Sequence, residues 1–196
     1  MVADRQAGLI PDLLLCGEHP HVITLGVSAR HRRANVLASR SVLQSRGIDL
    51  YEAPRGGDVT YHGPGQLVAY PVLDLKPERC DIHRYVRDLE EVVIRTVHEF
   101  GVEAARVAGL TGVWVGNDKL AAIGVRVSRW VTSHGFALNV NTELEYFSLI
   151  RPCGIDGRGV TSLARLTGAP VSLDAVIDAL ARSFALVFDR DLVFRE

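Results

Sequence analysis

The stretch that shapes the predicted fold is Arg55-Gly56-Gly57-Asp58-Val59-Thr60-Tyr61-His62-Gly63-Pro64-Gly65-Gln66, which places four glycines and a proline in twelve positions. Because glycine has no Cβ, the backbone can turn sharply here and come close to a ligand. The Gly63-Pro64-Gly65 step adds rigidity, which favours a shaped wall over a mobile tip. We expect a loop that approaches a ligand; a surface hairpin loop has the same composition and remains the alternative.

Two features limit what this loop can bind. No Gly-Lys-Ser or Gly-Lys-Thr sequence follows it, so it is not a phosphate-binding P-loop. Thr60 and His62 could donate hydrogen bonds to a ligand, but a lone histidine is more often structural. The loop by itself therefore does not identify a substrate.

Short apolar, partly β-branched segments precede the glycine-rich stretch and predict strands. Two of them, Leu13–Cys16 and Val22–Leu25, read as buried strands, and residues 48–52 form a third strand that leads into the loop. Residues 36–46 predict a short helix, which Gly47 would end as a glycine cap. Strands therefore dominate the N-terminal part of the chain.

Two amphipathic helices are predicted after the loop. Apolar side chains recur at helical spacing from Ile82 to Phe100, where Asp81 is placed to cap the start and Gly101 to end the helix. Ser172 is placed to cap a second helix, whose apolar face runs from Leu173 to Val187. The apolar stripe of the first helix is interpreted as a core face rather than a cofactor site.

Between these helices the sequence predicts a hairpin and a further strand. Residues 113–115 and 120–127 read as strands joined by a tight turn at 116–118, since Gly and Asn readily take the positive φ that such turns need. Lys119 would then begin the second strand, and residues 136–140 form another. Clustered strands interrupted by two helices predict a mixed α/β domain, an α+β arrangement, rather than a βαβ series.

The overall composition fits one globular domain spanning residues 1–196. Hydrophobic residues make up 47% and charged residues 23% of the 196, which is ordinary for a folded protein and enough for a core without disulfides or a metal. The 22 basic and 23 acidic residues leave a net charge of −1. A nucleic-acid-binding protein would show a basic excess, so nucleic acid is not an expected partner.

Cysteine usage and hydropathy indicate the compartment. Cys16, Cys80 and Cys153 are an odd number at wide spacing, which argues against a disulfide framework or a cysteine zinc site and fits a reducing cytoplasm. The longest uncharged stretch, residues 59–73, is too short and too interrupted by glycine and proline to cross a bilayer. The N-terminus lacks the apolar core of a secretory signal. We expect a soluble cytoplasmic protein that does not insert in a membrane.

Cys153 is the candidate nucleophile. It lies between Pro152 and Gly154 in a glycine-rich segment that reads as a loop, so the thiol can be accessible. The commoner fate of a cysteine is that of a small buried hydrophobe. A thiol becomes a useful nucleophile when a nearby cation or helix N-terminus lowers its pKa from about 8.5. Lys119 is a candidate cation, although a lysine in a turn is more often solvated.

A metal site has little support in the sequence. His19 and His21 flank Pro20 and could hold an ion together. No further cluster of cysteine or histidine supplies the three or more ligands that a protein metal site needs. We therefore expect no metal.

Five motifs follow one another along the chain. They are Glu18-His19-Pro20 with Thr24-Leu25-Gly26; the glycine-rich stretch continued through Leu67 to Tyr70-Pro71; Lys119 with Ala122-Ile123-Gly124; His134 to Val140; and Pro152-Cys153-Gly154 followed by Val160-Thr161-Ser162-Leu163. In this order they resemble the lipoyl(octanoyl) transferase family, the octanoyl-carrier-protein:protein N-octanoyltransferases of the biotin/lipoate protein ligase superfamily. The resemblance covers residues 13–163.

The resemblance implies a largely antiparallel sheet flanked by helices, as in the catalytic domain of biotin and lipoate ligases. It implies that Cys153 carries the octanoyl group as a thioester, and that Lys119 lowers the pKa of that cysteine and shuttles protons. It also implies the residues of the acyl-binding walls: Arg55, Gly56, Gly57, Asp58, Val59, Thr60, Tyr61, His62, Ala122, Ile123, Gly124, Gly135, Phe136 and Ala137.

The implied partners are octanoyl-acyl carrier protein as donor and, as acceptors, the lipoyl domains of 2-oxoacid dehydrogenases and the glycine cleavage H protein. The donor is already a thioester, so no ATP, metal or other cofactor is implied, and a monomer is expected. Family members usually carry an additional strand and helix before Leu13, and only a dozen residues stand there. We expect the outer strand and most of the first helix to be absent.

Two alternatives remain open. An ATP-dependent lipoate or biotin ligase would form an acyl-adenylate and need no cysteine, and the segment Asp156-Gly157-Arg158-Gly159 is a weak match to a loop that holds such an intermediate. A non-catalytic module that binds acyl groups or carrier proteins would keep the fold alone. ATP-dependent activity that survives Cys153→Ala would favour the ligase. A Cys153 that fails to react selectively near neutral pH would favour the binding module.

Overall fold

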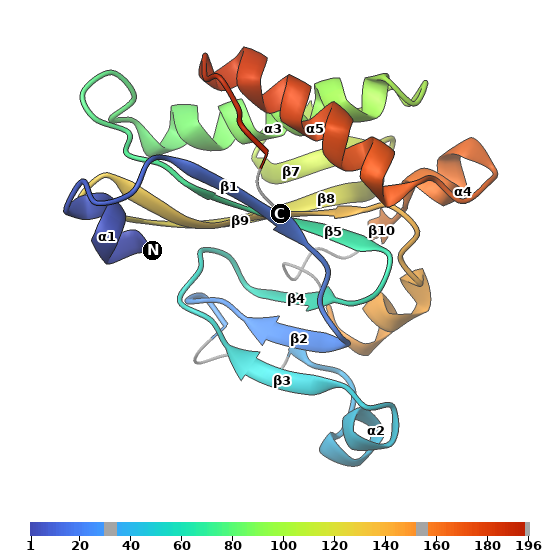
Figure 1. The fold of residues 1–196 in the computed structure, drawn as a ribbon. Helices are drawn as coiled ribbons and strands as arrows, with labels where there is room; N and C mark the ends of the chain where they lie inside the picture. Colours follow the sequence, from blue (N-terminus) through green and yellow to red (C-terminus); the bar gives the residue numbers. More distant parts are fainter. Residues whose placement is uncertain (30–34, 152–156, 195–196) are drawn as a thin grey trace.

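The fold is layered. A computed structural model describes residues 1–29, 35–151 and 157–194. Helices α3 (Ile82–His98) and α5 (Leu173–Phe188) cover one face of a seven-stranded sheet, and a three-stranded sheet lies against the other face (Figure 1). The mixed α/β class predicted from the sequence is confirmed.

The main sheet is antiparallel apart from one short strand. Its order is β1 (Leu13–Gly17), β5 (Gln66–Val72), β9 (Val131–Asn139), β8 (Asp118–Ser128), β7 (Leu110–Val115) and β6 (Ala105–Val107). The exception is β10 (Gly159–Val160), which pairs in parallel with the start of β8. The central β8–β9 hairpin is long, and its turn residues Arg129 and Trp130 take positive φ.

The small sheet has β2 (Val22–Leu25) in its centre, with β3 (Asp49–Glu52) parallel on one side and β4 (Val59–His62) antiparallel on the other. It has a core of its own, separate from the main core between the large sheet and the helices. Helix α2 (Arg40–Ser45) and the 3₁₀ helix η2 (Leu144–Leu149) contribute Leu43, Phe147 and Leu149 to this small core.

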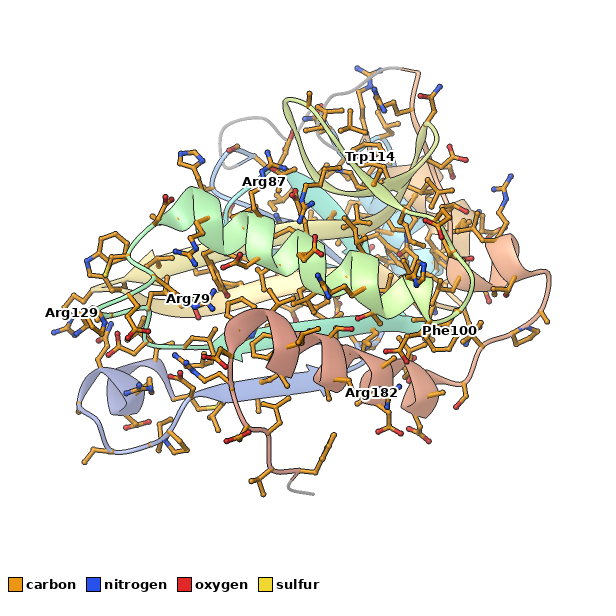
Figure 2. The ribbon with its side chains drawn as sticks, turned by 90° about the horizontal axis from the view of Figure 1, so that it is seen from above. Arg79, Arg87, Phe100, Trp114, Arg129 and Arg182 are labelled. Atoms are coloured by element: carbon orange, nitrogen blue, oxygen red, sulfur yellow. The ribbon has the colours of Figure 1, made fainter. Side chains whose placement is uncertain are left out.

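Side-chain caps fix the helix starts that the sequence predicts. The Asp81 side chain accepts the N–H of Arg84 at the start of α3, and the Ser172 side chain accepts the N–H of Ala175 at the start of α5. The two helices lie side by side over the sheet, as Figure 2 shows from above. Two short helices, α1 (Val2–Gln6) and α4 (Leu163–Thr167), complete the described helices.

Four local predictions need correction. The glycine-rich stretch is not one loop, because its β-branched and aromatic residues form β4 and its last residue begins β5. The helix predicted for 36–46 starts only at Arg40, since Ser39 caps it by accepting the N–H of Val42. The strand at Leu13–Gly17 is half-buried rather than buried, because β1 is the outermost strand of the main sheet. The strand predicted for 136–140 begins earlier, at Val131.

None of the helices in the described part of the chain has the length and apolar character needed to cross a bilayer.

Candidate active site

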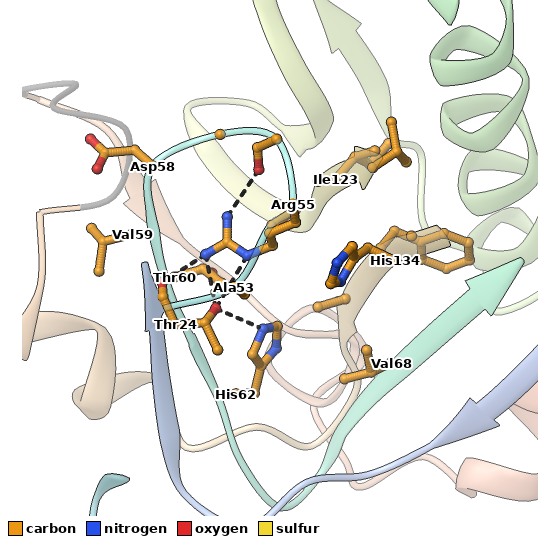
Figure 3. A pocket seen from close by; sticks show the side chains of 18 of the residues that line it. Thr24, Ala53, Arg55, Asp58, Val59, Thr60, His62, Val68, Ile123 and His134 are labelled. Atoms are coloured by element: carbon orange, nitrogen blue, oxygen red, sulfur yellow. Dashed lines mark hydrogen bonds between the residues drawn. The ribbon is translucent and has the colours of Figure 1, made fainter. Parts of the chain in front are cut away.

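A cavity of about 980 Å³ lies between the two sheets, on the face of the main sheet opposite the helices. Strands β2 and β4 and the loop before β4 form one wall, and β5, β8 and β9 form the other (Figure 3). The start of α3 and the turn before β7 close one end through Ile82, Val86 and Leu110. The lining is mainly apolar, and a few polar groups point into it.

Small residues make the space on the main-sheet side. Ala122 pairs with Ala137 and Gly124 with Gly135 across β8 and β9, so these four share one face of the sheet. The alternating positions Ile123 and Phe136 belong to the main core on the other face, where Phe136 is only 2% exposed, although both also touch the cavity wall. The resemblance implied that these six residues together form the acyl-binding wall. In the structure four of them form the wall, and the other two belong mainly to the core.

The glycines of the loop before β4 allow it to lie directly on β8. The backbone N–H of Gly56 donates to the carbonyl of Val125 at 2.9 Å. A Cβ at Gly124 would stand 2.8 Å from the Gly56 carbonyl oxygen, which is too close for any side chain. The loop and the strand can come this close because neither Gly56 nor Gly124 has a Cβ. The loop therefore functions as part of the cavity wall.

Arg55 fixes the loop to the small sheet. Its guanidinium donates to the Thr24 hydroxyl at 2.8 and 3.2 Å, to the Thr24 carbonyl at 2.7 Å and to the Gly56 carbonyl at 3.0 Å. Figure 3 shows these bonds converging at the centre of the cavity wall. A planar guanidinium that makes several hydrogen bonds is held more rigidly than a lysine ammonium at the same position would be.

His62 is held neutral in the wall. Its Nδ1 lies 2.8 Å from Gln66 Oε1, and its Nε2 lies 3.5 Å from the Thr24 hydroxyl. Arg55 can only donate, so the Thr24 hydroxyl accepts from Arg55 and directs its own proton to His62 Nε2. The hydrogen-bond pattern therefore assigns the ring proton to Nδ1. Burial lowers the pKa of His62 to about 4, with a smaller lowering from Arg55 and His19.

The polar chain continues to the strand that carries Lys119. Gln66 Nε2 donates to Asn139 Oδ1 at 2.9 Å, and Asn139 Nδ2 donates to the Thr161 carbonyl at 2.9 Å. The N–H of Thr161 then donates to the Lys119 carbonyl at 3.0 Å. Hydrogen bonds thus connect the glycine-rich stretch with Lys119 along the cavity wall.

Lys119 itself lines the cavity and is only 8% exposed. Its Nζ lies 4.7 Å from the centroid of the Trp114 ring. The parallel pairing of β10 places Val160 beside it. The alternative of a solvated turn lysine does not hold for Lys119, because the β7–β8 hairpin turns the side chain inward.

Most residues of the implied walls lie around this one cavity. The lining includes Arg55, Gly56, Gly57, Asp58, Val59, Thr60, His62, Lys119, Ala122, Ile123, Gly124, Gly135, Phe136 and Ala137. Tyr61 is different: it is fully buried in the small core, where its hydroxyl lies 2.8 Å from His21 Nδ1. Along β4 the residues alternate, so Tyr61 points away from the cavity. Cys153 lies outside the described residues.

Several lining residues were not selected from the sequence. Thr24, Gln66 and Asn139 supply the polar chain, and His134 lines the cavity with a pKa lowered by burial and by Arg55 and Arg126. The sequence contains only a weak signal for these residues: a polar side chain that faces inward from a strand needs a hydrogen-bond partner. Trp114, which is buried beside Lys119, gave no signal beyond its place in a strand.

The two histidines considered for a metal each pair with a tyrosine. His19 Nε2 shares a hydrogen bond of 2.5 Å with the Tyr70 hydroxyl, and His21 pairs with Tyr61. Within residues 1–29, 35–151 and 157–194, no group of three or more His, Cys, Asp or Glu side chains could hold a metal ion.

The sequence matches the model of the lipoyl protein ligase A/B catalytic domain over residues 1–185. The chain belongs to this family. Among its relatives, it is 52% identical over 193 residues to a protein of Solibacter usitatus named octanoyltransferase, covering 98% of this chain and 86% of that one. It is also 52% identical over 185 residues to an octanoyltransferase of Caldicellulosiruptor bescii, with 93% and 80% of the two chains covered.

Several solved structures share the fold. Lipoate-protein ligase A bound with ATP superposes with a TM-score of 0.77 at 22% identity, over 94% of this chain and 75% of that one. The bipartite lipoate protein ligase of Thermoplasma acidophilum gives the same TM-score and identity, over 100% and 78%. A biotin protein ligase of Aquifex aeolicus is more distant, with a TM-score of 0.57 at 18% identity over 86% and 70%. At these identities the likeness shows the fold alone.

Proposed function

We propose that this chain is an octanoyltransferase of protein lipoylation, which takes octanoyl from octanoyl-acyl carrier protein and gives it to a lysine of a lipoyl domain. The observation that carries the proposal is the near-half identity, over nearly the whole chain, to family members named octanoyltransferase. The apolar cavity beside a buried Lys119 supplies a place where an acyl group and a cation meet.

In the first step, the Cys153 thiolate attacks the thioester carbonyl of the donor. A new carbon–sulfur bond forms, and the phosphopantetheine thiolate leaves and is protonated. One thioester replaces another, so the exchange is close to thermoneutral and needs neither ATP nor a metal. A cationic Lys119 beside the thiol favours the thiolate, and it can give its proton to the leaving sulfur.

In the second step, the ε-amine of the acceptor lysine attacks the Cys153 thioester. The carbon–nitrogen bond forms, the Cys153 thiolate leaves, and a more stable amide results. Neutral Lys119 accepts the proton that the incoming amine loses. Backbone N–H groups at the wall would stabilise the oxyanion of each tetrahedral intermediate.

The cavity suits a medium-length acyl chain. Burying seven or so methylene and methyl groups at about 0.8 kcal/mol each gives roughly 5–6 kcal/mol. Small residues such as Gly124 and Ala137 leave room for the chain, and Val68 lines its path. This free energy favours octanoyl over short acyl groups.

The flanks of the Cys153 segment support its proposed partnership with Lys119. Before it, the Arg151 N–H donates to the Asn35 carbonyl at 2.8 Å. After it, β10 pairs with the first two residues of β8, Asp118 and Lys119. The described chain on the C-terminal side of Cys153 thus returns to the strand that carries the lysine.

The test is intact mass after the purified protein is mixed with octanoyl-acyl carrier protein, without ATP and with EDTA. We expect the mass of one octanoyl group to be gained, lost when a lipoyl domain is added, and absent in Cys153→Ala. Lys119→Arg should keep the charge but slow both steps. Cys80→Ala is the matched control, because that thiol is exposed and lies outside the cavity lining. Transfer that requires ATP and survives Cys153→Ala would replace the proposal with a lipoate ligase.

A further inference from the structure

Trp114 is a buried indole on which two cations meet. Its side chain is 2% exposed. The Lys119 Nζ lies 4.7 Å from the ring centroid, and the Arg158 Cζ lies 5.0 Å from it. Both distances are within the range of cation–π attraction, which is strongest for tryptophan and grows when the pair is removed from water. Figure 2 shows Trp114 on the far side of α3 from α5.

The β7–β8 hairpin enforces the contact between Trp114 and Lys119. The two residues are direct partners across the hairpin, so their side chains leave the same face of the sheet. Gly112 allows the hairpin strands to come close here, since a Cβ would stand 2.6 Å from the Ala121 carbonyl oxygen, while the Lys119 stem would lie at ordinary contact distance from it, 3.5 Å at Cε. Backbone register, and not only side-chain preference, therefore holds the ammonium near the indole.

The indole is buried at a cost that packing alone does not explain. Within the described residues, Trp114 Nε1 is buried without a hydrogen-bond partner. A buried N–H that is left unpaired is unfavourable, and native proteins contain few of them. A leucine at this position would avoid that cost, although it would fill less of the space. The ring face, occupied by cations, is what tryptophan adds.

We propose that Trp114 is a positioning residue for Lys119: its ring holds the ammonium at the cavity wall, next to the strand that follows the Cys153 segment. This rests on the catalytic role proposed for Lys119. Arg158 makes the same ring a second cation site, and the two charges are at most about 10 Å apart because both lie near one centroid. Positive charge is thereby concentrated where the thiolate and the oxyanions would form.

The first measurement is the rate of alkylation of Cys153 against pH, followed by peptide mass, with exposed Cys80 as the internal reference in the same sample. We expect Trp114→Leu to move the midpoint for Cys153 to higher pH and to slow its reaction at neutral pH between about twofold and thirtyfold, the range of one cation–π contact. Trp114→Phe keeps a weaker ring face and should fall between wild type and Trp114→Leu.

A double-mutant cycle separates positioning from a general structural effect. Because Trp114 acts chiefly through Lys119, the shift caused by Trp114→Leu should be much smaller in a Lys119→Ala background, where only the contact with Arg158 remains to be lost. Phe184→Leu, at a buried aromatic of α5, is the control for lost packing and should leave the pH profile of Cys153 unchanged. Thermal melts establish that each variant is folded.

The outcomes are distinct. A folded Trp114→Leu with the wild-type profile overturns the positioning role, while a Lys119→Ala that still shifts the profile leaves the proposed catalytic role of the lysine intact. An equal effect of Trp114→Leu with and without Lys119 also overturns it. If Lys119→Ala itself leaves the profile unchanged, both the positioning role and the lysine's role fall. Octanoyl thioester formation by the wild type, measured separately, decides the proposed function.

Discussion

The buried carboxylate of Glu90 accepts the backbone N–H of Gly112 at 3.0 Å, which ties helix α3 directly to β7. Its other oxygen lies 2.6 Å from Arg87 and 3.2 Å from Arg106. A fully buried carboxylate is stable only when it is paired in this way. The strand that carries Trp114 is thus anchored to the helix layer two residues earlier.

Glu90→Ala should lower the free energy of unfolding by about 2–3 kcal/mol, because it leaves the Gly112 N–H unpaired and opens a cavity. Urea denaturation measures the change. Glu99→Ala, at the C-terminal cap of the same helix, is the control, since Glu99 and its partner Arg182 are 41% and 62% exposed and such pairs contribute at most about 1 kcal/mol. Equal losses in the two variants would contradict the anchoring role of Glu90.

Gly124→Ala should reduce octanoyl transfer at least about tenfold, because its methyl group would displace the Gly56 carbonyl and with it the loop that forms the wall. Steady-state transfer to a lipoyl domain measures this. Gly17→Ala is the matched control: that glycine is also in a strand of the main sheet, and a Cβ there meets nothing within 4 Å. Transfer by Gly124→Ala within twofold of wild type would show that the close approach is dispensable.

Arg55→Lys should also slow transfer by about tenfold, although the charge is kept. A lysine cannot reach the Thr24 hydroxyl, the Thr24 carbonyl and the Gly56 carbonyl together, whereas the guanidinium does. Arg126→Lys on β8 is the control, since Arg126 is exposed and is not among the lining residues. Wild-type transfer by Arg55→Lys would mean that charge, rather than the fork geometry, is what the site needs, and a matching loss in both variants would show that the effect is not specific to Arg55.

Stability should fall as the pH drops from about 6.5 to about 4. The pKa of His62 is lowered from 6.5 to about 4, so in this window the unfolded chain binds a proton that the folded chain does not. The loss approaches about 3 kcal/mol by pH 4, and it is absent above pH 7. Urea midpoints across this range measure it.

His62→Gln removes this titration, so its stability should decline less steeply with falling pH. Burial also lowers the pKa of His134, which contributes in the same direction and leaves a residual slope in the variant. Parallel pH profiles for wild type and His62→Gln would show that His62 does not titrate as its burial implies.

The helices could be predicted from the sequence because their signals are local. The apolar period from Ile82 onward and the caps Asp81 and Ser172 lie within a few residues of the feature that they specify. The strand at Val22–Leu25 was predicted for the same reason. Helix ends were less certain, and α3 ends at His98, two residues before the predicted end.

Strand partners and the division of the wall could not be predicted in this way. The segments at Leu13 and Val22 look alike, yet they join different sheets, because an alternating pattern gives a strand its faces but not its neighbour. Likewise Ile123 lies beside Gly124, and only the register with β9 decides which of them faces the cavity. The polar chain from Thr24 to Asn139 joins residues far apart in sequence, so no local window contains it.

The small and main cores are separate clusters with the cavity between them. Strands β2, β3 and β4 can therefore open as a unit without disrupting the packing under α3 and α5. Native-state hydrogen exchange should find the amides of the small sheet less protected than those of β8 and β9. An acyl chain that fills the cavity would contact both sheets, so its binding would chiefly slow the opening of the small sheet.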